Sequence, residues 1–138
     1  MAVKTHLGYI GIGSNIDSGE KEITLALEFL EKNCDSVELS RIYKTPSVSG
    51  DGSEYYNAVA RVVTNIEAIE FSQELKRWEI SRGRRDRERE IKIVPIDLDL
   101  VIYDDEVLRQ RDFMQSYFTI GYQWLLSGAD HAPSERIV

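Results

Sequence analysis

The chain has 138 residues, a length that suits one domain with a hydrophobic core of its own. Hydrophobic residues make up 42% of it and charged residues 30%, which is ordinary for a globular protein. The net charge of −7 disfavours nucleic acid and anionic membranes as partners, because both are themselves negatively charged. The single cysteine, Cys34, excludes an internal disulfide and a thiolate metal site.

The sequence also carries no signal that would direct it to a membrane. No segment approaches the roughly 18 consecutive apolar residues that cross a bilayer. Residues 1–7 lack the apolar core of a signal peptide. We therefore expect a cytoplasmic protein with a single domain over 1–138, and a monomer is the default oligomeric state. His6 and His131, near the two ends, are expected at the surface.

The first half of the chain predicts a strand, a helix and two further strands. Residues 7–12 form the first strand, and residues 21–33 carry apolar positions at helical spacing. Two β-rich segments follow, 36–45 and 57–65. A Gly- and Ser-rich loop with the sequence PSVSGDGSEY joins them.

The second half predicts a helix, a strand and a last helix. Residues 66–83 have helical periodicity and end at Gly83, a residue typical of helix C-termini. Residues 96–103 form a strand, and the tail from Asp112 predicts one more helix. The order βαββαβ is that of the ferredoxin-like α+β fold, an antiparallel sheet with two helices on one face. The other face of such a sheet is expected to be open.

Two acidic residues, Asp97 and Asp99, lie in the predicted strand 96–103. The apolar residues that alternate with them are Ile96, Leu98, Leu100 and Ile102. Because side chains alternate between the faces of a strand, the apolar set should face the helices and both acids the open face, about 7 Å apart. Neighbouring carboxylates repel unless a cation lies between them, and oxygen ligands suit Mg²⁺ bound beside substrate phosphates. The alternative is a pair of solvated acids on a wet face.

A basic segment, 81–92, comes just before the acidic pair. Its cations are Arg82, Arg84, Arg85, Arg87, Arg89 and Lys92. Guanidinium groups beside an oxygen-ligand metal site can bind a polyphosphate, and the closeness of the two features favours this interpretation. The alternative is a solvated loop whose charges offset one another. A P-loop is excluded, because the pattern G-x-x-x-x-G-K-[ST] does not occur.

The third feature is the loop 43–58, which is long for a compact domain. Long loops of this kind often carry function, although a flexible hairpin connection is the alternative. Asn57, where the chain resumes a strand, can both donate and accept hydrogen bonds. The edge of a heteroaromatic ring requires that combination.

Five motifs follow one another over most of the chain. They are YIGIGSN at 9–15, IYKTP at 42–46, YYNA at 55–58, WEISRGRR at 78–85 and IDLDLVIYDDEVL at 96–108. In this order and spacing the sequence resembles the 6-hydroxymethyl-7,8-dihydropterin pyrophosphokinase family of folate biosynthesis. The resemblance implies a ferredoxin-like enzyme that moves diphosphate from ATP to the hydroxymethyl group of a reduced pterin and releases AMP.

The resemblance also implies roles for individual residues. Asp97 and Asp99 match a pair that holds two Mg²⁺ ions between ATP and the pterin. The catalytic residues so implied are Arg84, Lys92, Asp97 and Asp99. The implied pterin-binding residues are Thr45, Pro46, Val48, Tyr55 and Asn57. The implied nucleotide-binding residues are Glu79, Arg84, Arg85 and Arg87. The expected partners are thus small molecules, with ATP as co-substrate.

The chain departs from the family at two places. Where the family has Trp-Gly-Pro-Arg-Thr, residues 91–95 read Ile-Lys-Ile-Val-Pro, so a stacking Trp and an Arg are missing. Segment 111–123 lacks the family's His. The residues that could replace these groups are Arg111, Phe113, Tyr117 and Phe118. Two alternatives follow: a divergent relative that binds nucleotide or pterin with altered transfer, and a non-enzymatic ferredoxin-like interaction module.

Overall fold

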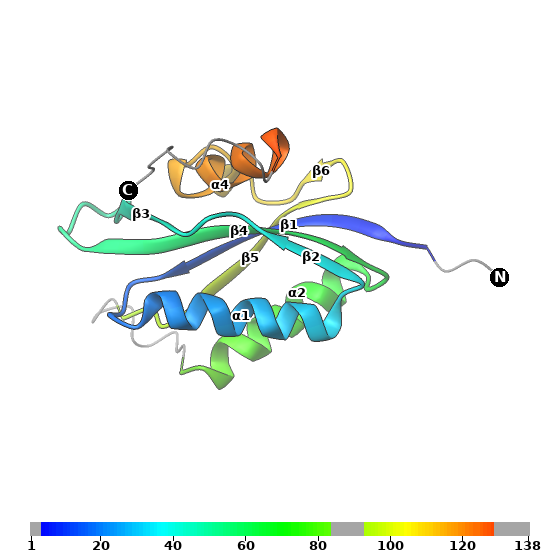
Figure 1. The fold of residues 1–138 in the computed structure, drawn as a ribbon, viewed down its shortest axis with the longest axis horizontal. Coiled ribbons are helices and arrows are strands. Elements are labelled where there is room, and N and C mark those ends of the chain that lie inside the picture. The colour runs from blue at the N-terminus through cyan, green and yellow to red at the C-terminus, as the bar shows by residue number, and fades with distance from the viewer. Residues whose placement is uncertain (1–3, 84–92, 129–138) are drawn as a thin grey trace.

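The computed structural model describes residues 4–83 and 93–128 (Figure 1). The strands are β1 (His6–Ser14), β2 (Ser36–Leu39), β3 (Tyr43–Pro46), β4 (Glu54–Thr64), β5 (Asp97–Tyr103) and β6 (Glu106–Val107). The helices are α1 (Gly19–Asn33), α2 (Ala68–Ser81), α3 (Gln110–Phe113) and α4 (Ser116–Ser127).

The strands form one antiparallel sheet with β1 at its centre. β1 pairs with β4 on one side and with β5 on the other. β2 and β3 both pair with β4, and β6 pairs with β5, which gives the order β2-β4-β1-β5-β6. Helices α1 and α2 lie side by side on one face (Figure 1). The predicted ferredoxin-like α+β fold is confirmed.

The main core lies between the sheet and helices α1 and α2. In α1, Ile23, Ala26 and Leu30 recur at helical spacing and are fully buried. The sheet contributes Ile10, Ile12, Ala58, Ala60, Val62, Leu98 and Leu100 to the same cluster. Burial of each large aliphatic side chain contributes on the order of 1.5–3 kcal/mol, so this face holds the helices firmly.

The second face of the sheet is not open, and the expectation of an exposed face is wrong. Helix α4 crosses that face (Figure 1). A second cluster of buried residues forms there, made of Tyr9, Val59, Val101, Ile102, Phe118 and Leu125. Gly121 permits the close approach, because a Cβ at this position would lie 2.6 Å from Val59 Cγ2. Helix α4 therefore covers part of this face of the sheet.

Strand β5 does not alternate regularly, which changes the position of Ile102. Tyr9 pairs with Ile102 and Ile10 with Leu100, so Val101 is an extra residue in β5. Leu98 and Leu100 face the main core as expected, whereas Ile102 joins the cluster under α4. The prediction for Ile102 is wrong because strict alternation holds only for a strand without a bulge.

The region between β2 and β4 is more ordered than the sequence predicts. The expected single strand 36–45 is two short strands, β2 and β3, which both pair with β4. Ser40, between them, accepts a hydrogen bond from the Val59 backbone N–H at 2.9 Å. The expected loop 43–58 lies largely in strands, and only residues 47–53 connect β3 to β4. The segment therefore forms a β3–β4 hairpin, and its functional role stays a prediction.

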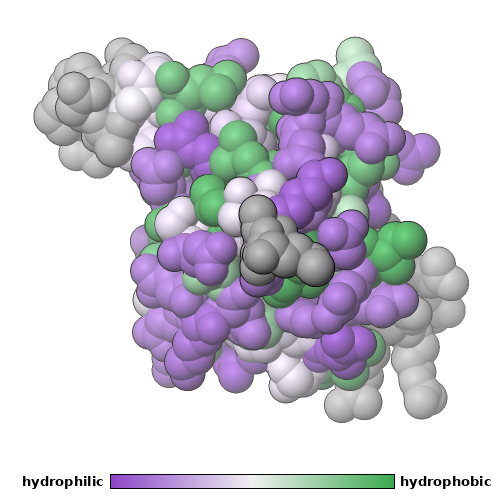
Figure 2. Space-filling view, turned by 90° about the vertical axis from the view of Figure 1, so that its right-hand side faces the viewer, coloured by the Kyte–Doolittle hydropathy of each residue, from purple (hydrophilic) through white to green (hydrophobic). Residues whose placement is uncertain are grey.

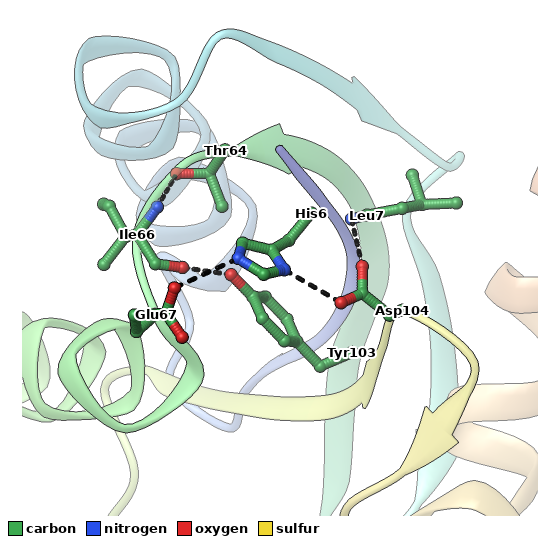
Figure 3. Close-up of polar contacts among 7 residues, drawn as sticks. All are labelled: His6, Leu7, Thr64, Ile66, Glu67, Tyr103 and Asp104. Carbon is green, nitrogen blue, oxygen red and sulfur yellow. Dashed lines mark hydrogen bonds and ion pairs between the residues drawn. The ribbon is translucent and has the colours of Figure 1, made fainter. Parts of the chain in front are cut away.

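Near the start of the chain, His6 is buried rather than at the surface, and only 6% of it is exposed. Its ring stacks on Tyr103 and lies between Asp104 and Glu67 (Figure 3). The expectation for His6 is wrong because the charged turn after β5 folds back onto it. His131 lies outside the described residues.

The outside of the molecule is largely hydrophilic where β1 begins. On that side, hydrophobic side chains form small separate groups among charged and polar ones, as on a surface that faces water (Figure 2). Within residues 4–83 and 93–128, none of the helices combines the length and the apolar character that crossing a membrane requires.

Candidate active site

A pocket of about 370 Å³ opens on the α4 face of the sheet. Its walls come from β1, the β3–β4 hairpin, the start of β5 and the first turn of α4. Small-molecule sites in proteins commonly have volumes in the range of about 300–1,000 Å³. The pocket therefore has room for a compact heterocycle.

Two glycines of β1 keep the pocket open. Gly11 and Gly13 both line it. A Cβ at Gly11 would lie 3.4 Å from Phe118 Cδ1, and one at Gly13 would lie 3.4 Å from Asn57 Oδ1. A side chain larger than a methyl group at either position would take up space between these walls.

The five residues implied to bind a pterin surround one end of this pocket. Thr45, Pro46, Val48, Tyr55 and Asn57 all line it. Asn57 is 3% exposed. Its Nδ2 donates hydrogen bonds to Thr45 Oγ1 at 2.7 Å and to the Tyr55 carbonyl at 3.1 Å. The first bond joins β4 to β3, the second lies within β4, and together they fix the orientation of the amide.

The acidic pair lies at the β5 end of the pocket, across β1 from Asn57, because Gly13 pairs with Asn57 in β4 and with Asp97 in β5. Asp97 and Asp99 both line it, and their carboxylate oxygens lie within 4.8 Å of one another and of a Glu79 oxygen. Burial of Asp99 next to Asp97 raises the pKa of Asp99 to about 8. Both the loss of hydration and the neighbouring charge of Asp97 disfavour the ionised form of Asp99. A hard cation would relieve this repulsion, and the oxygen-only donor set fits Mg²⁺.

Glu79 reaches the acidic pair from α2. Phe71, Leu75 and Glu79 follow one another at four-residue spacing and share the buried face of that helix. Glu79 is 1% exposed, and its Oε2 accepts a hydrogen bond from the Leu98 backbone N–H at 2.5 Å. Lys76 Nζ lies 3.2 Å from the other oxygen. Burial raises the pKa of Glu79. The structure therefore adds Glu79 to the candidate metal ligands, while its implied contact with the nucleotide stays a prediction.

The model of the 7,8-dihydro-6-hydroxymethylpterin-pyrophosphokinase family matches residues 9–125. The chain belongs to this family. The membership that the motifs indicate is thus confirmed.

Relatives from several bacteria share the name 2-amino-4-hydroxy-6-hydroxymethyldihydropteridine pyrophosphokinase. The Haemophilus influenzae protein is 32% identical over 104 residues, which cover 73% of this chain and 64% of that protein. The Aquifex aeolicus protein is 29% identical over 106 residues, which cover 75% of this chain and 64% of that protein. The Pseudomonas putida protein is 31% identical over 108 residues, covering 74% and 86%. The chain thus spans just under two thirds of the first two relatives.

The segment that departs from the family also borders the pocket. Val94 stands where the resemblance places an Arg, and it lines the pocket with an apolar side chain. Asn15 holds it in place: Asn15 Oδ1 accepts a hydrogen bond from the Val94 N–H at 2.7 Å, and the Asn15 N–H donates to the Val94 carbonyl at 3.0 Å. At this position the pocket wall therefore has an apolar side chain in place of the positively charged Arg that the resemblance implies.

The basic segment 81–92 is described only at its start. Arg82 forms two hydrogen bonds with the Glu22 carboxylate, at 3.0 and 2.8 Å, and so joins α2 to α1. The residues Arg84, Arg85, Arg87 and Lys92 lie outside the described residues, so their implied roles stay predictions.

Two residues that border the acidic pair, Arg109 and Asp112, are not among those predicted from the sequence. Asp112 lines the pocket and accepts hydrogen bonds from Arg109 Nε and Tyr117 Oη. Arg109 Nη2 lies 3.7 Å from Asp99 Oδ1. The signal that could have revealed them is the i, i+3 spacing of Arg109 and Asp112, which brings opposite charges together on one helical turn.

The four residues considered as replacements for the missing family groups have different positions. Tyr117 and Phe118 line the pocket. Phe113 packs against the cluster under α4, and Arg111 is exposed. Tyr43 fixes this wall, because its hydroxyl donates to the Tyr117 carbonyl at 2.7 Å and accepts from the Gly121 N–H at 3.0 Å.

Proposed function

We propose that this chain transfers diphosphate from ATP to the hydroxymethyl group of 6-hydroxymethyl-7,8-dihydropterin. The observation that carries the proposal is the single pocket bordered by Asn57 at one end and by Asp97 and Asp99 at the other. One end offers hydrogen bonds to a ring edge, and the other offers hard oxygen ligands. Family membership supports this interpretation, because the relatives are named for a reaction that joins a pteridine ring to a diphosphate, and the two sides of the pocket suit these two groups.

The Asn57 end would bind the pterin. Asn57 Nδ2 already donates to Thr45 and to the Tyr55 carbonyl, which fixes the amide and leaves Oδ1 to accept a hydrogen bond from a ring N–H. Pro46, Val48 and Tyr55 would pack around the ring. A ring without net charge needs mainly shape and hydrogen bonds, which this end supplies.

The acidic end would hold two Mg²⁺ ions on Asp97 and Asp99, with Glu79 close behind. Bound magnesium supplies positive charge that neutralises the triphosphate. Arg84, Arg85, Arg87 and Lys92 would add positive charge around the nucleotide, and Glu79 would lie near it. Asp97 and Asp99 are fixed at the start of β5, so the metal end is positioned by the sheet rather than by a loop.

In the reaction, the hydroxymethyl oxygen of the pterin attacks the β-phosphorus of ATP. The new oxygen–phosphorus bond forms as the bond from the β-phosphorus to the α-phosphate oxygen breaks. The hydroxyl proton is released to water, and AMP and the pterin diphosphate are the products. Most of the acceleration comes from holding the two substrates in line and from stabilising charge.

The decisive experiment mixes the protein with MgATP and the hydroxymethyl dihydropterin and measures AMP. We expect AMP only when the pterin is present, and at least a hundredfold loss of rate in Asp97→Asn. Asp105→Asn is the matched control, because Asp105 is an exposed acid in the turn after β5. Binding of MgATP by calorimetry without AMP would favour the divergent relative. Failure to bind either ligand would favour the interaction module.

A further inference from the structure

A group of charged side chains lies beside the acidic pair and has no role in the function proposed above. Arg109 stands just before α3, and half of its side chain is exposed. One edge of its guanidinium faces Asp112, and another lies 3.7 Å from Asp99. Arg109 is therefore shared between two carboxylates of the same pocket wall.

Asp112 determines where Arg109 points. It is buried on the pocket wall, and it accepts hydrogen bonds from both Arg109 Nε and Tyr117 Oη. The backbone carbonyl of Tyr117 is in turn held by Tyr43. A half-exposed arginine would otherwise sample many rotamers, so this chain of contacts keeps its positive charge near Asp99.

We propose that Arg109, positioned by Asp112, is a built-in counter-ion of Asp99 that sets how tightly the acidic pair binds a divalent cation. The inference rests on the proposed function, since it treats Asp97 and Asp99 as metal ligands. It assigns Arg109 and Asp112 to positioning and tuning of that site, not to ligation.

The physical reason is competition for the same carboxylate. A guanidinium next to Asp99 offsets part of the negative charge that attracts a cation, and it repels the cation directly. Removal of the Arg109 charge should therefore tighten cation binding. Asp112→Asn should weaken cation binding. It removes a nearby negative charge, and Arg109 then has Asp99 as its remaining charged partner among these two acids.

The test is calorimetric titration of the whole chain with Mn²⁺, without nucleotide or pterin. Arg109→Gln is expected to bind Mn²⁺ roughly tenfold more tightly than the wild type. Arg111→Gln is the matched control, because it removes the same charge from an exposed side chain of α3 and should change the affinity less than twofold. Far-UV circular dichroism checks that each variant is folded.

Asp112→Asn provides the second arm. It is expected to weaken Mn²⁺ binding, and its effect should shrink in the double variant with Arg109→Gln if it acts through Arg109. Opposite shifts in the two single variants cannot come from general destabilisation, which would weaken both.

The proposal is overturned if Arg109→Gln leaves the affinity unchanged or lowers it, if Asp112→Asn tightens binding, or if the wild type binds no Mn²⁺ at millimolar concentration. The AMP assay tests the proposed function separately from the Mn²⁺ titration, so either result can be negative without the other. A chain that shows the predicted Mn²⁺ pattern and makes no AMP would contradict the proposed function and leave the role of Arg109 intact.

Discussion

His6 Nδ1 lies 2.8 Å from Asp104 Oδ2, so a buried imidazole joins the first residue of β1 to the turn after β5 (Figure 3). Nε2 on the other side of the ring lies 3.3 Å from Glu67 Oε2, just before α2. Asp104 also accepts a hydrogen bond from the Leu7 N–H at 3.0 Å. Three segments that are distant in sequence therefore meet at one titratable ring.

This cluster makes stability depend on pH. The two carboxylates raise the pKa of His6 above its ordinary 6.5, and His6 lowers the pKa of Asp104 below 3.8. Stability from the raised His6 is complete below pH 6.5 and is lost as pH rises through its folded pKa. Stability from Asp104 is complete above pH 3.8 and is lost as pH falls through its folded pKa. Tyr103, with its pKa raised to about 12, stays neutral between these limits.

The prediction is that His6→Gln destabilises the protein more at about pH 5.5 than at about pH 8.5. Urea unfolding at both pH values measures the difference. Asp105→Asn is the control, because it alters an exposed charge in the same turn without touching the ring. Equal destabilisation at the two pH values would show that His6 acts only by packing on Tyr103.

The motifs predict the contents of the pocket better than its shape. Asp97 and Asp99 were expected at a metal site and Asn57 at a ring site, and the structure brings all three to one cavity. Local patterns suffice for this because the motif with Asn57 lies near the start of β4 and the motif with Asp97 and Asp99 lies at the start of β5. The bulge at Val101 was missed, since a bulge depends on pairing with β1 and leaves no mark in the alternation of a single strand.

The same reasoning explains the error about the open face. The composition of segment 116–127 predicts a helix, but the sequence does not predict which face of the sheet that helix covers. Its packing against Tyr9 and Val59 shows the face. Arg109 and Asp112 were missed for a related reason. Their importance comes from Asp99, which is close in space and belongs to another element.

The packing of α4 gives a second prediction, at Gly121. A Cβ there would lie 2.6 Å from Val59 Cγ2 and 2.8 Å from Tyr43 Oη. Gly121→Ala should therefore destabilise the protein by about 1–3 kcal/mol, although alanine favours helices in general. Gln123→Ala, at an exposed position of the same helix, should be neutral or slightly stabilising. Thermal unfolding of the pair measures this, and a stabilised Gly121→Ala would refute the close packing of α4 on β4.

A third prediction concerns Cys34, which follows α1 and packs against the main core. Burial raises the pKa of this thiol to about 11. At about pH 8 the reactive thiolate should be scarce, so alkylation should be roughly a hundredfold slower than for a free cysteine. Iodoacetamide labelling followed by mass spectrometry measures the rate. The control is the same reaction in urea, where the rate should return to normal; rapid labelling of the folded protein would contradict the burial of Cys34.

The last prediction separates the two ends of the pocket through Asn57. Asn57→Ala removes the side-chain amide from the β4 side of the pocket and leaves Asp97 and Asp99 in place across β1. Pterin affinity should fall at least tenfold, because each lost hydrogen bond in a buried site costs about 1–3 kcal/mol. The affinity for MgATP should stay within twofold.

Calorimetric titration with each ligand in turn measures the two affinities. Asn65→Ala is the control, since Asn65 is exposed after β4 and lies away from the pocket lining. Asn57 also bonds to Thr45, so some loss of stability is expected, and the titrations are made well below the unfolding temperature of the variant. Unchanged pterin affinity in a folded Asn57→Ala protein would place the ring elsewhere, and an equal loss for both ligands would mean that the two ends of the pocket are not separate sites.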